Sequence, residues 1–169
     1  MKLDKNGLNQ LQQEIMLVSE QLNDAKLKKG QTFSDDTNSW HDNAAYDQAK
    51  LEVDGLEYQL GSLKRELHEV ELVKSHGDIA RVDIGDIVEL YNKDFDDRFK
   101  VLLTANYKID IGDYDEISEI SINSPIGEAI FGKKAGDHTS YKVNNRNFDV
   151  EIVSFERSKT IQQNDQRQL

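Results

Sequence analysis

The chain has 169 residues, of which 37% are hydrophobic and 31% are charged. This composition is polar for one compact globule and typical of a chain with a long solvated helical part. The formal net charge is −11, which argues against a protein that holds nucleic acid by its own phosphate contacts and favours a basic protein surface as partner. The chain has no cysteine, so disulfides, thiol catalysis and cysteine-type zinc sites are excluded.

The sequence has no apolar run that could span a membrane, and the residues after Met1 lack the apolar core of a signal sequence. We therefore expect a cytoplasmic protein with no membrane partner. The histidines are scattered without metal-ligand spacing, at His41, His68, His76 and His138. We expect no tightly bound cofactor.

Two stretches of the first half repeat apolar residues at alternating steps of three and four, the a/d pattern of coiled-coil helices. The first seam comprises Leu8, Leu11, Ile15, Val18, Leu22 and Ala25. The second seam comprises Tyr46, Ala49, Val53, Leu56, Leu60, Leu63, Leu67 and Val70. Two such helices in succession pack most easily as an antiparallel pair. The sequence therefore predicts a coiled-coil hairpin over residues 1–76, joined by a segment from Lys29 to Asn43.

The joining segment, whose tip covers about residues 30–45, is acidic and aromatic. No lysine or arginine lies between Gly30 and Ala49. That stretch holds four acids and four ring-bearing residues, namely Asp35, Asp36, Asp42, Asp47, Phe33, Trp40, His41 and Tyr46. The acids have two interpretations: they cap a helix or decorate a loop, or they form a carboxylate cluster at the end of a long arm that shares a Mg²⁺ ion.

From about Gly77 the pattern changes to short β-branched and aromatic segments that predict strands. These are Ile87–Tyr91, Phe99–Thr104, Ile117–Ile122, Thr139–Val143 and Phe148–Phe155, with a hairpin turn over residues 144–147. One short helix is indicated by Ser124 as its N-cap, Pro125 at its first position and Gly132 just past its end. The sequence thus predicts an α+β fold, with a β-rich domain over residues 77–157 and a polar tail over residues 158–169.

Three motifs, in order and at matching spacing, resemble those of the GreA/GreB transcript cleavage factors. Residues 122–137 read INSPIGEAIFGKKAGD and are similar to the family's stretch N/D-S-P-x-x-x-A-hydrophobic-hydrophobic-G-K-x-x-G-D. Residues 7–15, GLNQLQQEI, are similar to the family's opening motif, G-x-x-x-L-x-x-E-hydrophobic. Residues 42–46, DNAAY, resemble the E-N-A-E/D-Y motif with which its second helix begins. The resemblance covers about residues 5–156.

The resemblance implies an antiparallel two-helix coiled coil joined to an FKBP-like domain. It also implies a bacterial transcription elongation factor that is not an enzyme by itself. By this resemblance, the globular domain docks at the rim of the RNA polymerase secondary channel and the coiled coil reaches down that channel. There two tip acids help hold a catalytic Mg²⁺ ion of the polymerase, whose activated water hydrolyses backtracked RNA.

The motifs assign these implied roles to residues of this chain. The tip acid, with the metal-holding role, is Asp42, and docking falls to Asn123, Ser124, Pro125 and Ile126. The implied partners are RNA polymerase directly and the 3′ end of the nascent RNA indirectly, and we expect a monomer. The pair Ser124-Pro125 also predicts a helix start, and both interpretations are compatible.

The tip departs from the family at one of its two acids. The family's first acid is matched by Ser39, whose neutral hydroxyl is a poor Mg²⁺ ligand, while Asp42 keeps the second acid one methylene shorter. Asp35 or Asp36 replaces the lost acid if the loop folds back, and His41 is a candidate for proton transfer near neutral pH. Two hypotheses stay open: a cleavage factor with a rearranged acid pair, and a non-cleaving paralogue that occupies the channel and regulates transcription.

Two functions from other classes also stay open on the pattern alone. An FKBP-like fold suggests a prolyl isomerase, for which rings are available at Tyr91, Phe95, Phe99, Tyr107 and Phe131. Such rings are more often part of a core. The heptad seams would alternatively serve a stand-alone coiled-coil scaffold or toxin-like module, in which they would form a tight dimer.

Overall fold

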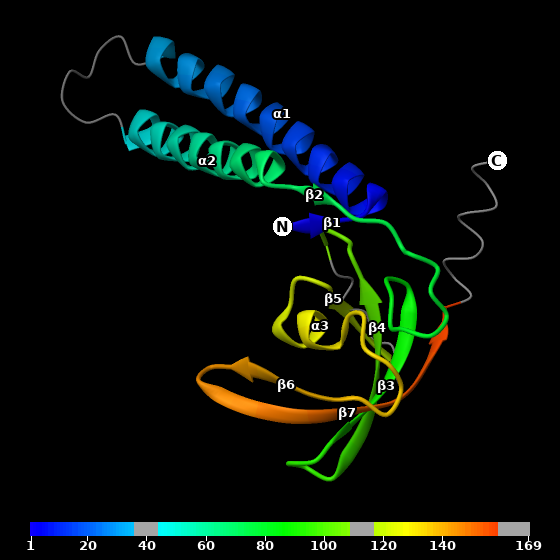
Figure 1. The fold of residues 1–169 in the computed structure, drawn as a ribbon. Helices are drawn as coiled ribbons and strands as arrows, with labels where there is room; N and C mark the ends of the chain where they lie inside the picture. Colours follow the sequence, from blue (N-terminus) through cyan, green and yellow to red (C-terminus); the bar gives the residue numbers. More distant parts are fainter. Residues whose placement is uncertain (36–43, 109–116, 159–169) are drawn as a thin grey trace. The chain divides into compact units, whose positions relative to one another are not determined.

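The chain divides into two compact units, one helical and one β-rich (Figure 1). The computed structural model describes residues 1–35, 44–108 and 117–158, with residues 33–35 described by their backbone only. The helical unit is Leu8–Val70, and the β-rich unit joins Met1–Gly7 to Glu71–Leu169. This division differs from the predicted boundary at residue 76, because both flanks of the hairpin belong with the β-rich unit. The predicted fold class is confirmed, with two long helices and a β-rich domain that carries one short helix.

The helical unit is a hairpin of α1 (Lys5–Asp35) and α2 (Ala44–His68). Lys26 Nζ lies 2.8 Å from Glu57 Oε1, and Lys28 Nζ lies 3.4 Å from Glu52 Oε2. Residue numbers therefore rise along one helix as they fall along the other, so the helices are antiparallel. The predicted seams are the buried faces, at Leu11, Val18, Leu22, Ala25, Ala49, Val53 and Leu63. Apolar residues off the seams are exposed, at Met16, Leu17, Leu27, Leu51 and Tyr58.

The first helix is longer than predicted. It continues past Lys29, where the joining segment was expected to begin, and ends at Asp35. At 1.5 Å per residue its 31 residues span roughly 46 Å. Residues 36–43, which include most of the predicted tip, lie outside the described residues. None of the helices in the described ranges is long and apolar enough to cross a membrane.

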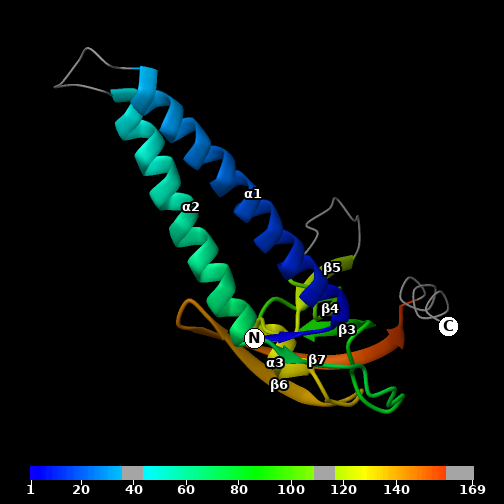
Figure 2. The same cartoon turned by 90° about the horizontal axis from the view of Figure 1, so that it is seen from above.

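The β-rich unit is built on a five-stranded sheet in the order β5-β4-β3-β7-β6 (Figures 1 and 2). Its strands are β3 (Asp86–Asn92), β4 (Asp97–Thr104), β5 (Ile117–Ser121), β6 (His138–Val143) and β7 (Arg146–Arg157). All five predicted strands are thus confirmed. Neighbours are antiparallel except for β4 and β5, which are parallel. Every second side chain along β3 is buried, and Val88 and Leu90 enter the core in this way.

Two local predictions in the β-rich unit are confirmed. Helix α3 (Pro125–Ile130) begins after Ser124, whose hydroxyl accepts a backbone hydrogen bond from the first turn, and Gly132 follows its end at φ +73°. The turn between β6 and β7 is narrower than predicted and consists of Asn144 and Asn145, with φ of 49° and 64°. Positive φ at both positions gives the type I′ turn that matches the strand twist, and asparagine tolerates this conformation.

The N-terminal residues form a strand that the sequence did not predict. β1 (Lys2–Leu3) pairs in parallel with β2 (Glu71–Leu72), and Leu3 is fully buried. Strands of two residues are too short to leave a periodic signature. Asp4 then caps α1, because its Oδ1 accepts a hydrogen bond from the NH of Gly7 at 2.7 Å.

Gly7 packs directly against the backbone that follows β4. A Cβ atom at this position would lie 2.4 Å from the carbonyl oxygen of Ala105 and 3.0 Å from the nitrogen of Tyr107. Only glycine permits such an approach without a shift of the backbone. Close packing against the backbone therefore explains why the motif at residues 7–15 opens with glycine.

The β-rich domain extends one residue further than predicted. Ser158, the first residue of the expected tail, is buried, and its NH donates to the carbonyl oxygen of Gly85 at 2.9 Å. This hydrogen bond directly follows the pairing of Asp86 in β3 with Arg157 in β7. Residues 159–169, the rest of the predicted tail, lie outside the described residues.

Substitution of Gly7 by alanine should destabilise the protein by about 1–3 kcal/mol, because the added methyl overlaps the Ala105 carbonyl oxygen. Gly55→Ala is the matched control. It lies in α2 with no atom within 4 Å of a Cβ atom, so the same change should stabilise the protein by about 1 kcal/mol. Thermal unfolding followed by calorimetry and circular dichroism compares the two. Equal effects of the two substitutions would contradict the packing role of Gly7.

Candidate functional site

The tip residues predicted from the sequence fall at the edge of the described chain. Asp35 is the last residue of α1. Outside the described residues lie Asp36, Ser39, Trp40, His41 and Asp42. The roles of these residues therefore stay predictions. Asp47 is exposed in the first turn of α2, where the positive end of the helix dipole favours a carboxylate.

The described end of the hairpin next to the tip is held by lysine, glutamate and tyrosine side chains. Lys29 Nζ lies 5.6 Å from the ring centroid of Tyr46, which is a cation–π contact between the two helices. The hydrogen bond and charge of Lys26 hold the pKa of the Glu57 carboxyl below its ordinary value. The contact of Lys29 with Tyr46 joins the last turns of α1 to the first turn of α2, whereas Lys26 meets α2 near its middle, at Glu57. An open groove of about 550 Å³ is lined by Lys26, Lys29, Gly30, Tyr46, Val53, Asp54 and Glu57.

The turn before α3, residues 121–125, is held by its own side chains. Ser124 Oγ donates to the carbonyl oxygen of Ser121 at 2.7 Å and accepts from the NH of Gly127 at 3.1 Å. A Cβ atom at Gly127 would lie 2.0 Å from the same carbonyl oxygen, so this position requires glycine. The amide of Asn123 bonds to the backbone of Lys2, with Nδ2 donating to the carbonyl oxygen at 2.7 Å and Oδ1 accepting from the NH at 2.8 Å.

Of the four residues predicted to dock, only Pro125 is exposed. Asn123 and Ser124 are half-buried with their polar groups bonded inside the unit, and Ile126 packs against the core. The interpretation of Ser124-Pro125 as a helix start is thus confirmed. The docking role stays a prediction, and the exposed surface available for it lies at Pro125 and Glu128.

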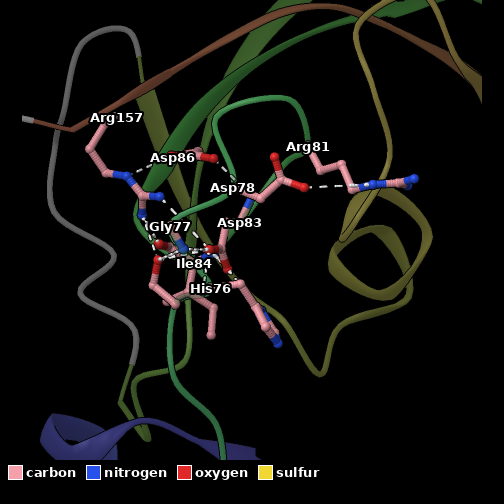
Figure 3. A network of polar contacts seen from close by, with 9 residues as sticks. His76, Gly77, Asp78, Arg81, Asp83, Ile84, Asp86 and Arg157 are labelled. Atoms are coloured by element: carbon pink, nitrogen blue, oxygen red, sulfur yellow. Dashed lines mark hydrogen bonds and ion pairs between the residues drawn. The ribbon is translucent and has the colours of Figure 1, made fainter.

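A buried carboxylate near the start of the β-rich domain is surrounded by hydrogen-bond donors (Figure 3). Asp83 is 3% exposed. Its Oδ2 accepts from Ser75 Oγ at 2.7 Å and from the NH of His76 at 2.6 Å. The NH groups of Gly77 and Ile84 also donate to this carboxylate. Burial alone would raise the pKa of Asp83, but these hydrogen bonds outweigh burial and hold the pKa below its ordinary value.

Arg157, at the end of β7, lies beside two buried carboxylates (Figure 3). Its Nε lies 3.1 Å from Asp86 Oδ1, and its Nη2 lies 3.8 Å from Asp83 Oδ2. Burial raises the pKa of Asp86, although the hydrogen bond from the Asp83 NH and the charge of Arg157 oppose the rise. Sequence analysis missed this network, because Arg157 lies far along the chain from the two acids. The available signal was the pair Asp83 and Asp86, three residues apart on either side of Ile84 and Gly85.

The rings considered for a prolyl isomerase serve different contacts. Phe99 and Phe131 pack against the core. Phe95 stacks on Phe148, with ring centroids 6.2 Å apart. The Tyr91 hydroxyl donates to Asp96 at 2.7 Å. These contacts give the isomerase hypothesis no support.

Comparison with known proteins identifies the family. The family described as "Transcription elongation factor, GreA/GreB, C-term" matches residues 77–157. The transcription elongation factor GreA of Chlorobaculum parvum is 30% identical over 156 residues, which cover 89% of this chain and 93% of that protein. The chain belongs to the GreA/GreB family. The GreA protein of Acholeplasma laidlawii is likewise 30% identical, over 163 residues that cover 89% of this chain and 93% of that protein.

Among solved structures, the crystal structure of GreA factor homolog 1 of Thermus thermophilus is 22% identical to this chain, with a TM-score of 0.41. The match covers 92% of this chain and 98% of that one. As a member of the GreA/GreB family, this protein is a transcription elongation factor, an accessory factor in transcription. The matched residues 77–157 contain both the turn before α3 and the carboxylates beside Arg157.

Ser124→Ala should destabilise the protein by about 1 kcal/mol, because it removes the N-cap of α3. Pro125→Ala is the matched control, since Pro125 is exposed and the change should alter stability by less than about 0.5 kcal/mol. Urea denaturation of the full chain measures both. A Ser124→Ala variant as stable as the unaltered protein would contradict the capping role.

Asp83→Asn should destabilise the protein by about 2–4 kcal/mol near neutral pH, because it leaves buried donors without their charged acceptor. The pKa of Asp83 is lowered in the fold. Its stabilisation is therefore complete above the unfolded pKa, about 4, and is lost as the pH falls through the lower folded pKa. The loss of unfolding free energy in the Asp83→Asn variant should therefore become smaller as the pH falls.

Asp86→Asn is the matched comparison, because the pKa of Asp86 is raised in the fold. Its protonation stabilises the fold below the unfolded pKa, and that contribution is lost as the pH rises through the higher folded pKa. For each variant, the difference in unfolding free energy from the unaltered protein should therefore change with pH, and the two variants should change in opposite directions. Urea denaturation between pH 3 and pH 7 tests this, and parallel slopes would contradict the assignment.

Proposed function

We propose that this protein stimulates RNA polymerase to cleave backtracked RNA, by inserting the tip of its helical hairpin into the polymerase secondary channel. Membership of the GreA/GreB family supports this role. The hairpin supplies the reach, because α1 alone spans roughly 46 Å. The net charge of −11 suits a basic protein channel better than free nucleic acid.

The observation that carries the proposal is the motif at residues 42–46, which overlaps the first residues of α2. In the sequence Asp42 stands two residues before Ala44, the first residue of α2, and α2 packs against α1. The contact between Lys29 and Tyr46 joins the two helices beside this segment.

The metal suited to this chemistry is Mg²⁺ held jointly with the polymerase. No group of three or more His, Asp or Glu side chains gathers into a metal site within residues 1–32, 44–108 and 117–158. Carboxylate oxygen is the ligand type that Mg²⁺ prefers, and Asp42 would supply one such ligand. When bound, the ion lowers the pKa of water and offsets phosphate charge. The remaining task of this chain is to carry Asp42 to that position and hold it.

A second candidate function is favoured by one observation, the serine at position 39. In this alternative the protein occupies the secondary channel and regulates transcription without stimulating cleavage. The two functions share docking and insertion and differ only in the chemistry of the tip. Asp35, at the end of α1, or Asp36 would restore a second acid in the cleaving version, and His41 remains a candidate for proton transfer.

Docking is proposed at the turn before α3 and the first turn of α3 itself, where Pro125 and Glu128 supply the accessible surface. Ser124 and Ile126 shape the turn from inside, through the helix cap and the core contact. A rigid exposed proline at the first position of a capped helix is a pre-formed surface, which lowers the ordering cost of binding.

Asp42→Ala should lower the rate of RNA cleavage in a stalled, backtracked elongation complex by about 10²-fold, because an electrostatic group at the reacting phosphate is lost. Polymerase binding should be unchanged. Ser39→Asp should raise the rate if the missing acid limits cleavage. The assay measures cleaved RNA and bound protein in the same samples.

Asp47→Ala is the matched control, since Asp47 is an exposed acid in the first turn of α2, and it should leave cleavage unchanged. Cleavage that survives Asp42→Ala would remove the metal-holding role from this tip. Binding without cleavage by the unaltered protein, with cleavage gained by Ser39→Asp, would favour the non-cleaving alternative. An unaltered protein that does not bind polymerase would contradict both functions.

A further inference from the structure

The side chain of Asn123 is bonded to the opposite end of the chain. Its Nδ2 donates to the Lys2 carbonyl oxygen at 2.7 Å, and its Oδ1 accepts from the Lys2 NH at 2.8 Å. A primary amide offers one donor and one acceptor side by side, so Asn123 pairs with Lys2 as a neighbouring strand residue would. The NH of Asn123 and its Nδ2 also lie 3.1 and 3.3 Å from Ser121 Oγ. Both ends of the amide are therefore engaged inside the β-rich unit.

The residue bonded by Asn123 belongs to β1, which is itself held by β2. The NH of Glu71 donates to the Met1 carbonyl oxygen at 2.8 Å, and the NH of Val73 donates to that of Leu3 at 2.9 Å. Met1 and Leu3 thus bond to β2, while Lys2 between them bonds to Asn123. The strand β1 links the turn before α3 to the residues that follow α2.

We infer that Asn123 is a positioning residue, which sets the docking turn through β1 and does not itself contact RNA polymerase. The inference rests on the proposed function, because it concerns the turn through which the chain would dock. Asn123 is half-buried, whereas the neighbouring Pro125 is exposed. In the free protein Nδ2 of Asn123 already donates to the Lys2 carbonyl oxygen and to Ser121 Oγ, and Oδ1 accepts from the Lys2 NH. A direct contact with polymerase would therefore have only the second lone pair of Oδ1 available, unless it displaced one of these bonds.

The inference distinguishes asparagine from aspartate at this position. An aspartate at position 123 would still accept from the Lys2 NH, but it would turn an oxygen instead of a donor towards the Lys2 carbonyl. It would keep one of the two bonds. Asn123→Ala would lose both. The order of polymerase affinity should therefore be asparagine, then aspartate, then alanine.

The test compares the full-length unaltered protein with four variants: Asn123→Ala, Asn123→Asp, Lys2→Ala and Lys2→Pro. The Lys2 substitutions form a matched pair, because only the backbone of Lys2 bonds to Asn123. Lys2→Ala keeps both bonds, whereas Lys2→Pro removes the NH donor. Affinity for a purified bacterial RNA polymerase and amide hydrogen exchange at residues 2 and 3 are both measured. Thermal unfolding verifies that each variant is folded.

Asn123→Ala should weaken polymerase binding about tenfold and speed exchange at the Lys2 NH, because both hydrogen bonds to Lys2 are lost. Asn123→Asp and Lys2→Pro should have smaller effects, and Lys2→Ala should have none. The double variant Asn123→Ala/Lys2→Pro should bind no worse than Asn123→Ala alone, since both changes break the same link.

Two results would overturn the inference while leaving the proposed function intact. One is an Asn123→Ala variant that binds polymerase as tightly as the unaltered protein. The other is a double variant in which the losses of affinity from Asn123→Ala and Lys2→Pro add in full, since additive losses would indicate that Asn123 acts independently of Lys2, through a direct contact. An unaltered protein that does not bind polymerase, with exchange at the Lys2 NH still slowed by Asn123, would reject the proposed function and this role with it.

Discussion

The parallel pairing of β1 with β2 is the constraint on which the rest of the chain depends. The NH groups of Glu71 and Val73 donate to the carbonyl oxygens of Met1 and Leu3. These bonds hold together the two points at which the chain leaves the β-rich unit and returns to it. The residues between these points, Leu8–Val70, must therefore leave the β-rich unit and return to it. Two helices with one apolar seam each meet this requirement when they pack seam to seam. The hairpin is thus a consequence of closure at its base as well as of the heptad pattern.

The β-rich unit is closed by buried charge in addition to its apolar core. Asp83, Asp86 and Arg157 tie the residues before β3 to the end of β7. Transfer of charge out of water costs several kcal/mol, and this cost is offset only when the polar atoms are hydrogen-bonded. No buried side-chain nitrogen or oxygen in the described part of the chain lacks a partner. The network therefore favours one position of the start of the β-rich domain relative to the end of β7. The turn before α3 belongs to the same unit.

The parts of the fold that the sequence predicts are those that local chemistry decides. The heptad steps identify the buried seams of α1 and α2, and Ser124 marks the start of α3, because each signal lies within a few residues. The strand β1 and the ion pair of Asp86 with Arg157 could not be predicted, because each joins residues that are distant in the chain. Such contacts leave no periodic pattern in the sequence. The turn before α3 lies between these two cases. Its motif identifies Asn123 from the sequence, but only the contact with Lys2 indicates what that side chain does.

The central claim is that the end of the hairpin at which α2 begins reaches the polymerase active centre. The direct test replaces Gln48, which is exposed near the start of α2, with a photoreactive residue in a stalled elongation complex. Gln12, which is exposed near the start of α1, is replaced in the same way as the comparison. The account predicts that Gln48 crosslinks to the 3′ end of the nascent RNA and that Gln12 does not. Crosslinks from Gln48 only to the outer surface of the polymerase, or equal RNA crosslinking from both positions, would contradict it.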